Sequence, residues 1–425
     1  KVRSGVCVMM FSQQLWKRAV GRFARRFSDD TSEYYLGVKN APFSYKMEFS
    51  SGNCTIPTYR VLDSEGALSD RDHVVNIDEQ TLVKLYKGMV TLRTMDGLFF
   101  DIQRQGRISF YMTSAGEEAL QFGSASAMKD SDVVYGQYRE PGVIMYRGFT
   151  LDQFASQCFA CHDDLGKGRQ MPVHYGSKAL NYHTISSPLA TQIPQAAGAA
   201  YALKMEGKQR CVVCYFGDGA ASEGDFHPAL NFAATRDCPV IFFCRNNGYA
   251  ISTPIKDQYR GDGIAPRAVG YGMQAIRVDG NDLIAVHEVT KAARELAVKE
   301  NRPVFIEAMS YRGGHHSTSD DSTAYRSPEE ILDWQLTDDP LTRTRNYLRN
   351  LGCWTDAQED GLLKTVREEV MASISKAEKK KKPSLDNMFT DVYEEIPVHL
   401  EEQRRCLQEH LKKYPEDYKV DQYHS

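Results

Sequence analysis

The sequence predicts a doubly wound α/β fold with a mainly parallel sheet. Two continuous apolar segments, 210–216 and 239–245, have the pattern of parallel strands that are covered on both faces. The segment between them, 223–236, has helical spacing. Strand, helix and strand patterns follow one another again at 276–280, 283–300 and 303–308. Such alternation is typical of βαβ units, whose strands pair in parallel.

Further helices are predicted on both sides of this central region. From residue 78 to about 103, apolar side chains recur at helical spacing, beginning with Leu82 and Leu85. Thr113 and Ser114, followed by acidic residues, indicate the start of a second helix. The Ala-rich segment 195–205 predicts a closely packed helix. After a polar loop, 311–327, helical stretches at about 328–350 and 356–381 form a C-terminal extension.

The two ends of the chain differ from its centre. Residues 1–27 combine many basic side chains with apolar ones and precede the first acidic residue, Asp29. This is the composition of a mitochondrial transit peptide; a solvated basic arm is the alternative. We expect an extended arm at 28–55, the α/β domain at 56–383, and a tail at 384–425 that packs on a partner subunit.

Composition excludes several classes of protein. The 52 basic and 56 acidic residues give a net charge of −4, which argues against a generally basic nucleic-acid-binding protein. The chain contains no apolar run of about 18 residues, the length that a membrane-spanning helix needs. The 10 cysteines are sparse, and several lie in apolar, strand-like runs. A disulfide scaffold is therefore not indicated.

One cysteine motif could suggest a bound haem or metal. Cys158, Cys161 and His162 match the haem-attachment spacing, and with Cys211 and Cys214 they could suggest a zinc site. However, Cys211 and Cys214 are three positions apart in a predicted strand. Their side chains should therefore point to opposite faces of the sheet. We assign neither haem nor zinc.

Polar residues follow two predicted strands that should be neighbours in the sheet. Gly217, Asp218 and Gly219 come directly after one strand, and Asn246 and Asn247 come directly after the next. Because the carboxyl ends of parallel strands meet at one edge of a sheet, these side chains should lie close together. A carboxylate and an amide oxygen, together with diphosphate oxygens and a backbone carbonyl, suit Mg²⁺. We also expect a helix beginning near Ala220 to point its N–H groups at an anion.

This pair of motifs resembles the fingerprint of thiamine-diphosphate enzymes. From about residue 50 to about 420, the chain also resembles the α subunits of branched-chain 2-oxo acid dehydrogenases. The segments that carry this resemblance are YGQYRE at 135–140, GKGRQMPVH at 166–174, SSPLATQ at 186–192, FCRNNGYAI at 243–251 and GHHSTSDD at 314–321. The resemblance implies the thiamine-diphosphate-binding form of the α/β fold.

The resemblance also implies roles for individual residues. Mg²⁺ would be bound by Asp218, Asn247 and the carbonyl of Tyr249. Arg139 and Arg245 would hold the diphosphate, because a planar guanidinium suits phosphate oxygens. His316 would contact the cofactor and act on the substrate as an acid, a base or an oxyanion partner. The remaining residues implied to line the cofactor are Gln137, Tyr138, Ser187, Leu189, Gly219 and Ala220.

A potassium site and two regulatory sites are implied in the same way. The potassium ligands would be Ser186, Pro188, Thr191 and Gln192. Ser317 and Ser327 match serines that are phosphorylated in this family. A phosphate on Ser317 would add negative charge next to His316. The alternative for Ser327 is a helix N-cap before Pro328.

The implied function is oxidative decarboxylation of branched 2-oxo acids derived from leucine, isoleucine and valine. The acyl group would pass to lipoyllysine of a dihydrolipoyl transacylase core, with release of CO₂. The implied partners are a β subunit, in an α₂β₂ heterotetramer, and a regulatory kinase and phosphatase, all in the mitochondrial matrix. No nucleic acid or membrane span is expected.

Three alternatives remain. A pyruvate dehydrogenase α subunit would share the cofactor fingerprint. A nucleotide-binding oxidoreductase would need Gly-x-Gly-x-x-Gly after its first strand, and no such segment occurs in that setting. A non-catalytic assembly subunit could keep the fold, although the presence of Asp218, Asn247 and His316 argues against it.

Overall fold

The computed structural model describes residues 46–47, 49 and 55–424. The predicted transit peptide at 1–27 and most of the predicted arm at 28–55 lie outside the described residues. The unit described below begins at Asn53 in the chain. None of the helices in this described part is long and apolar enough to cross a membrane.

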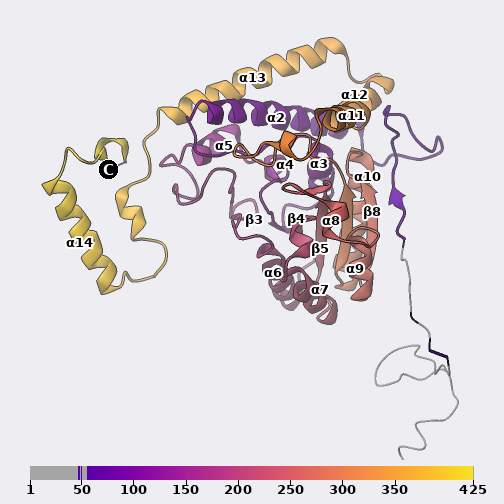
Figure 1. The fold of residues 1–425 in the computed structure, drawn as a ribbon, viewed down its shortest axis with the longest axis horizontal. Coiled ribbons are helices and arrows are strands. Elements are labelled where there is room, and N and C mark those ends of the chain that lie inside the picture. The colour runs from indigo at the N-terminus through magenta and orange to yellow at the C-terminus, as the bar shows by residue number, and fades with distance from the viewer. Residues whose placement is uncertain (1–45, 48, 50–54, 425) are drawn as a thin grey trace, which may run out of the picture. The chain divides into compact units, whose positions relative to one another are not determined.

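A seven-stranded parallel sheet forms the centre of this unit (Figure 1). Its strand order is β1-β8-β9-β5-β4-β2-β3. A separate antiparallel hairpin, β6-β7, follows β5. The predicted α/β fold with a mainly parallel sheet is confirmed. The strands are β1 Thr58–Tyr59, β2 Val133–Tyr135, β3 Tyr182–His183, β4 Val212–Gly217, β5 Val240–Asn246, β6 Tyr249–Ala250, β7 Thr253–Pro254, β8 Gln274–Asp279 and β9 Val304–Met309.

Helices cover both faces of the sheet, and each face has its own hydrophobic core. Val213 and Tyr215 of β4 face a core that α2, α3, α10 and α13 complete, whereas Val212 and Cys214 face the core of α6, α7 and α9. In Figure 1, α13 runs along α2. The helices are α2 Glu79–Arg104, α3 Glu118–Ala127, α4 Pro141–Tyr146, α5 Leu151–Cys158, α6 Gln192–Glu206, α7 Phe226–Thr235, α8 Ile255–Gln258, α9 Ala265–Gly270, α10 Leu283–Glu300, α11 Pro328–Thr337, α12 Pro340–Asn350, α13 Asp356–Glu378 and α14 Val398–Lys413.

The prediction that Cys211 and Cys214 face opposite sides of the sheet is confirmed. Cys211 belongs to one core and Cys214 to the other. The thiols of the haem-like motif have other partners: Cys161 donates to the carbonyl of Ala377 (3.3 Å), and Cys158 lies 3.5 Å from the Tyr175 hydroxyl. Burial raises the pKa of Cys161 to about 11, so this thiol is protonated at neutral pH.

Two predicted helices differ from the observed ones. The stretch at 328–350 is divided into α11 and α12, because Asp339 caps a new helix in which Pro340 takes the first position. The Asp339 carboxylate accepts from the backbone N–H of Thr342 (2.9 Å). The helix expected near Ala220 is only a short 3₁₀ turn, Ala220–Ser222, and α7 begins at Phe226. The prediction that a helix begins near Ala220 and points its N–H groups at an anion is therefore wrong.

The buried carboxylate of Asp282 ties the segment that follows β1 to the start of α10. One of its oxygens accepts from the N–H groups of Val61 (2.7 Å) and Leu62 (2.6 Å), and the other caps α10. We expect Asp282→Ala to reduce the free energy of unfolding by about 3 kcal/mol or more, because it leaves four buried N–H groups without an acceptor. Urea unfolding followed by circular dichroism measures this change. Asp63→Ala, which removes a carboxylate from a surface turn, is the control and should cost much less.

The C-terminal tail makes polar contacts with the domain of its own chain. Backbone hydrogen bonds connect Lys382 with Gln422 and His424, both at 2.8 Å. Asp391 pairs with Arg169 (2.9 Å) and Lys167. Helix α14 has no buried residue. Packing of this tail on a partner subunit stays a prediction.

Candidate active site

The predicted site residues gather around the carboxyl ends of the central strands. Asp218 follows β4, Asn247 follows β5, and Arg139 lies in the loop after β2. The register of β4 and β5 pairs Gly217 with Arg245, the residue before Asn246. His316 comes from the loop after β9 and reaches Arg139. The topology therefore brings together four segments that are far apart in the sequence.

Two buried carboxylates hold Arg245. Its Nε donates to Glu140 (2.5 Å), and its Nη1 donates to Glu117 (2.7 Å). The second oxygen of Glu140 accepts from the backbone N–H groups of Gln137 (2.8 Å) and Tyr138 (3.1 Å). Arg245 is thus a buried guanidinium that organises the loop after β2, in addition to its predicted role at the diphosphate.

The residues predicted to hold Mg²⁺ fit a cation. Asp218 is 2% exposed, and its Oδ2 accepts from Nε2 of Gln258 (2.7 Å). Within the described residues it forms no ion pair, and burial raises the pKa of its carboxyl group. A buried carboxylate without a counter-charge is costly, and a bound cation removes that cost. Nδ2 of Asn247 donates to Glu117, which leaves the amide oxygen on the side of Tyr249.

Gly219, directly after Asp218, allows close packing at this edge. A Cβ atom at Gly219 would lie 2.8 Å from the Cβ of Ala250, which is closer than side chains tolerate. Gly217 donates its N–H to Oε1 of Gln137 (2.7 Å), and this bond joins the loop after β2 to the end of β4. The hairpin that carries Tyr249 can therefore approach the end of β4.

His316 is held as a neutral imidazole. Nη2 of Arg139 donates to its Nδ1 (3.1 Å), so the ring proton is on Nε2. Burial and the positive charges of Arg139 and Arg312 lower the pKa of His316 to about 3. Nη1 of Arg139 donates to the carbonyl of Thr113 (2.8 Å), which fixes the guanidinium. His316 can thus donate a hydrogen bond from Nε2 to a reacting group.

The two predicted phosphorylation sites differ in accessibility. Ser317 is buried, and its hydroxyl accepts from the N–H of Ser319 (3.2 Å). Ser327 is exposed and caps α11 by accepting from the N–H of Glu330 (3.1 Å), as the alternative interpretation expected.

The predicted potassium ligands lie together in one turn. Thr191 donates to the carbonyl of Pro188 (3.1 Å) and lies 3.2 Å from the hydroxyl of Ser186. Gln192 is buried and donates to the carbonyl of Tyr215 (3.1 Å). Ser187 is hydrogen-bonded to Nε2 of His174 (2.8 Å), and Leu189 is 39% exposed.

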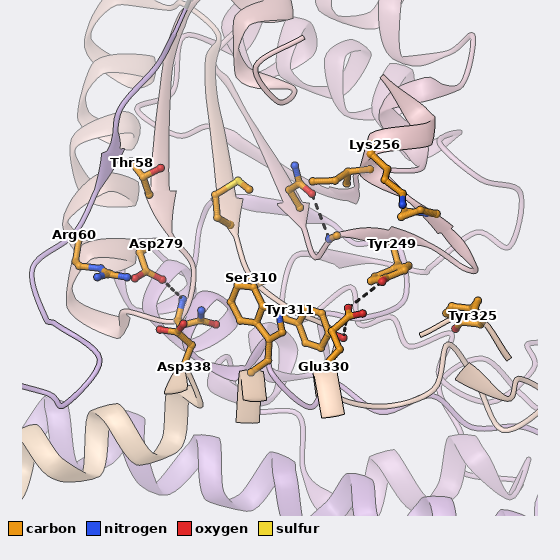
Figure 2. Close-up of a pocket in the computed structure, with 17 residues that line it drawn as sticks. Thr58, Arg60, Tyr249, Lys256, Asp279, Ser310, Tyr311, Tyr325, Glu330 and Asp338 are labelled. Atoms are coloured by element: carbon orange, nitrogen blue, oxygen red, sulfur yellow. Dashed lines mark hydrogen bonds and ion pairs between the residues drawn. The ribbon is translucent and has the colours of Figure 1, made fainter. Parts of the chain in front are cut away.

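A pocket of about 840 Å³ opens at the carboxyl ends of β1, β8, β9 and β5 (Figure 2). Of the predicted site residues, only Tyr249 lines it. Figure 2 shows Glu330 beside Tyr249 and Tyr311, and its Oε1 accepts from both hydroxyls, at 2.9 and 2.8 Å. Ring stacking of Trp334 on Tyr311 connects α11 to the same cluster. The pocket therefore adjoins the predicted metal site through the β6 hairpin.

A family model described as "Dehydrogenase E1 component" matches residues 86–386 of this chain, which is well over half of its length. The chain belongs to the dehydrogenase E1 component family. Family membership confirms the predicted class of enzyme, an oxidoreductase, and implies thiamine diphosphate as the cofactor.

Named relatives within the family cover nearly the whole chain. It is 54% identical over 404 residues to the Homo sapiens protein named "2-oxoisovalerate dehydrogenase subunit alpha, mitochondrial". This alignment covers 95% of this chain and 91% of the human protein. The Dictyostelium discoideum protein of the same name is 53% identical over 386 residues, and the alignment covers 91% of this chain and 88% of that protein. The Arabidopsis thaliana "subunit alpha 2" is 52% identical over 366 residues, covering 86% and 78%. The resemblance to branched-chain α subunits is thereby confirmed.

Sequence reasoning missed several residues that organise the site. Glu140 belongs to a segment that carried the resemblance, but it had no assigned role. Glu117 was interpreted only as part of a helix start. Gln258, which contacts Asp218, and Glu330, which contacts Tyr249, had no sequence signal at all. Their roles depend on contacts that span 40 and 81 positions in the chain.

Proposed function

We propose that this chain is the α subunit of a mitochondrial enzyme that decarboxylates branched 2-oxo acids and passes the acyl group to a lipoyl group on a transacylase. The main support is that Asp218 and Asn247 are buried at the carboxyl ends of β4 and β5, and that Arg139, in the loop after β2, holds His316 as a neutral imidazole. The names of the relatives support the branched substrate and the mitochondrial location, for which we propose the matrix. A pyruvate dehydrogenase α subunit is the alternative.

Thiamine diphosphate, when bound, would supply the electron sink for the decarboxylation. Asp218, Asn247 and the carbonyl of Tyr249 would hold its Mg²⁺, and Arg245 and Arg139 would lie near the diphosphate. Gln137, Tyr138, Ser187, Leu189, Gly219 and Ala220 would line the cofactor. From Nε2, His316 would donate a hydrogen bond to the oxygen of the 2-oxo acid, where negative charge develops.

K⁺ is proposed at the turn that contains Ser186, Pro188, Thr191 and Gln192. The proposal is supported by the hydroxyl and carbonyl oxygens of Ser186, Pro188 and Thr191, which are in mutual contact and are the type of ligand that such an ion needs. A bound ion would fix the adjacent Ser187 and Leu189. The α-subunit names of the relatives imply a β subunit. We propose that it completes the site in an α₂β₂ heterotetramer, which binds a transacylase core and is regulated by a kinase and a phosphatase.

Ser317 and Ser327 are the proposed phosphorylation sites. Because Ser317 is buried, its modification requires the loop to open, and the new charge would lie beside His316. We expect Ser317→Glu to lower the decarboxylation rate at least about tenfold, which corresponds to ~1.4 kcal/mol in the barrier. Ser327→Glu, at an exposed helix start that favours a negative charge, should have a much smaller effect. Full activity of Ser317→Glu with normal lipoyl-domain binding would contradict this role.

The proposed function is tested by comparing 3-methyl-2-oxobutanoate with pyruvate as substrates. The chain is co-expressed with its β subunit and given thiamine diphosphate, Mg²⁺ and K⁺. A strong preference for the branched acid supports the proposal. Preference for pyruvate would keep the cofactor site but overturn the substrate. Binding of the cofactor without turnover of either acid would favour a non-catalytic subunit.

A further inference from the structure

We propose that Glu117 is a positioning residue that determines which atom of the Asn247 amide faces the bound metal ion. This inference rests on the proposed function, because Mg²⁺ and thiamine diphosphate are assigned there. Neither the sequence motifs nor the names of the relatives assign a role to Glu117. It lies one residue before α3, and Asn247 lies 130 positions further along the chain.

The geometry around Glu117 leaves the Asn247 amide one favourable orientation. Glu117 is 1% exposed, and its Oε2 accepts from Nη1 of Arg245 (2.7 Å). Its Oε1 accepts from Nδ2 of Asn247. An ionised carboxylate can only accept hydrogen bonds, so the NH₂ group of Asn247 must turn toward it. The amide oxygen then faces the other way, where the N–H of Tyr249 reaches it (3.3 Å).

The backbone before α3 fixes Glu117 in this position. Gly116 has φ +91°, and a Cβ atom there would lie 2.1 Å from the carbonyl oxygen of Tyr311. Only glycine therefore allows this close approach. The N–H of Glu117 donates to the carbonyl of Ser114 (2.9 Å). The neighbouring acid, Glu118, is also buried but pairs with Arg93, so the two carboxylates serve different partners.

Glu117→Gln should reverse the orientation of the amide. Arg245 can only donate, so it takes the single oxygen of the new side chain. The NH₂ group of that side chain then faces Asn247, which must turn its own oxygen toward it. The metal ion would meet Nδ2, which cannot bind a cation. We expect the affinity for Mg²⁺, in the presence of thiamine diphosphate, to fall about 10- to 100-fold, as when residues that orient metal ligands are removed.

A second substitution should restore the orientation without changing net charge. In Glu117→Gln/Asn247→Asp, the NH₂ group of residue 117 donates to one oxygen of residue 247, and the other oxygen faces the metal ion. We expect Mg²⁺ affinity to return to within about threefold of wild type. This difference is much smaller than the loss predicted for the single variant. Glu359→Gln, on α13, changes a buried acid that contacts Tyr86 and Trp354, away from Glu117, and is the control, with Mg²⁺ affinity unchanged.

The experiment is calorimetric titration of the α₂β₂ protein with Mg²⁺ at fixed thiamine diphosphate, with assembly checked by size-exclusion chromatography. Weakened binding in the single variant and recovery in the double variant support the inference. Unchanged Mg²⁺ affinity in Glu117→Gln overturns it. If the single variant does not assemble, the double variant decides, and its failure to assemble or to bind Mg²⁺ also overturns the inference. Failure of the wild-type protein to bind thiamine diphosphate with Mg²⁺ would instead overturn the proposed function, and this inference with it.

Discussion

Asp218→Asn is expected to weaken Mg²⁺-dependent binding of thiamine diphosphate at least about 100-fold, because residues that only support metal ligands already contribute 10- to 100-fold. The substitution keeps the size of a side chain that is 2% exposed, so packing should be preserved. The substitution removes the negative charge of Asp218. In the described part of the chain, no ion pair neutralises that charge. Calorimetric titration of the α₂β₂ protein with thiamine diphosphate and Mg²⁺ measures the effect.

The control for this prediction is Asp225→Asn. Asp225 follows the same strand, is exposed, and caps α7 without a side-chain hydrogen bond. Its substitution should leave cofactor binding unchanged. Equal affinities of Asp218→Asn and wild type would exclude Asp218 as a metal ligand.

His316→Ala is expected to lower kcat by about 10²- to 10⁴-fold, the usual contribution of a positioned acid, base or hydrogen-bond donor. The affinity for thiamine diphosphate should fall much less than kcat, because His316 is only one of several residues proposed to contact the cofactor, and Asp218 and Asn247 hold it through its metal ion. Single-turnover decarboxylation and calorimetric titration separate the two effects. His227→Ala, on α7, is a control that should retain wild-type kcat. A loss of cofactor binding that parallels the loss of rate would indicate a structural role for His316.

The same histidine should contribute to the pH dependence of stability. Its pKa is about 3 in the folded chain, against an ordinary value of 6.5. Between these values the unfolded chain binds a proton at this side chain and the folded chain does not. The free energy of unfolding should therefore fall as pH is lowered from 7 toward 5. Urea unfolding at both pH values should show a smaller decrease for His316→Gln, and an equal decrease would contradict the low pKa.

Much of the sheet and several helices could be predicted from local patterns. The apolar runs at 210–216 and 239–245 became β4 and β5, and α10 begins and ends at the predicted residues, Leu283 and Glu300. These elements are buried on both faces or strongly periodic, so their pattern alone distinguishes them. The division at Asp339 was missed, because a proline at the first helical position is compatible both with a break and with a new helix start.

By itself, the sequence determined the class of fold, the family resemblance, which singled out His316, and the positions of Asp218 and Asn247 at the ends of predicted strands. It could do so because strand ends, glycines and polar residues leave a local signature. Only the tertiary structure decided which groups orient these residues: Glu117 for Asn247, Gln258 for Asp218 and Arg139 for His316. The physical reason is that a buried hydrogen bond between distant segments depends on how the layers pack, and packing leaves no periodic trace in the chain.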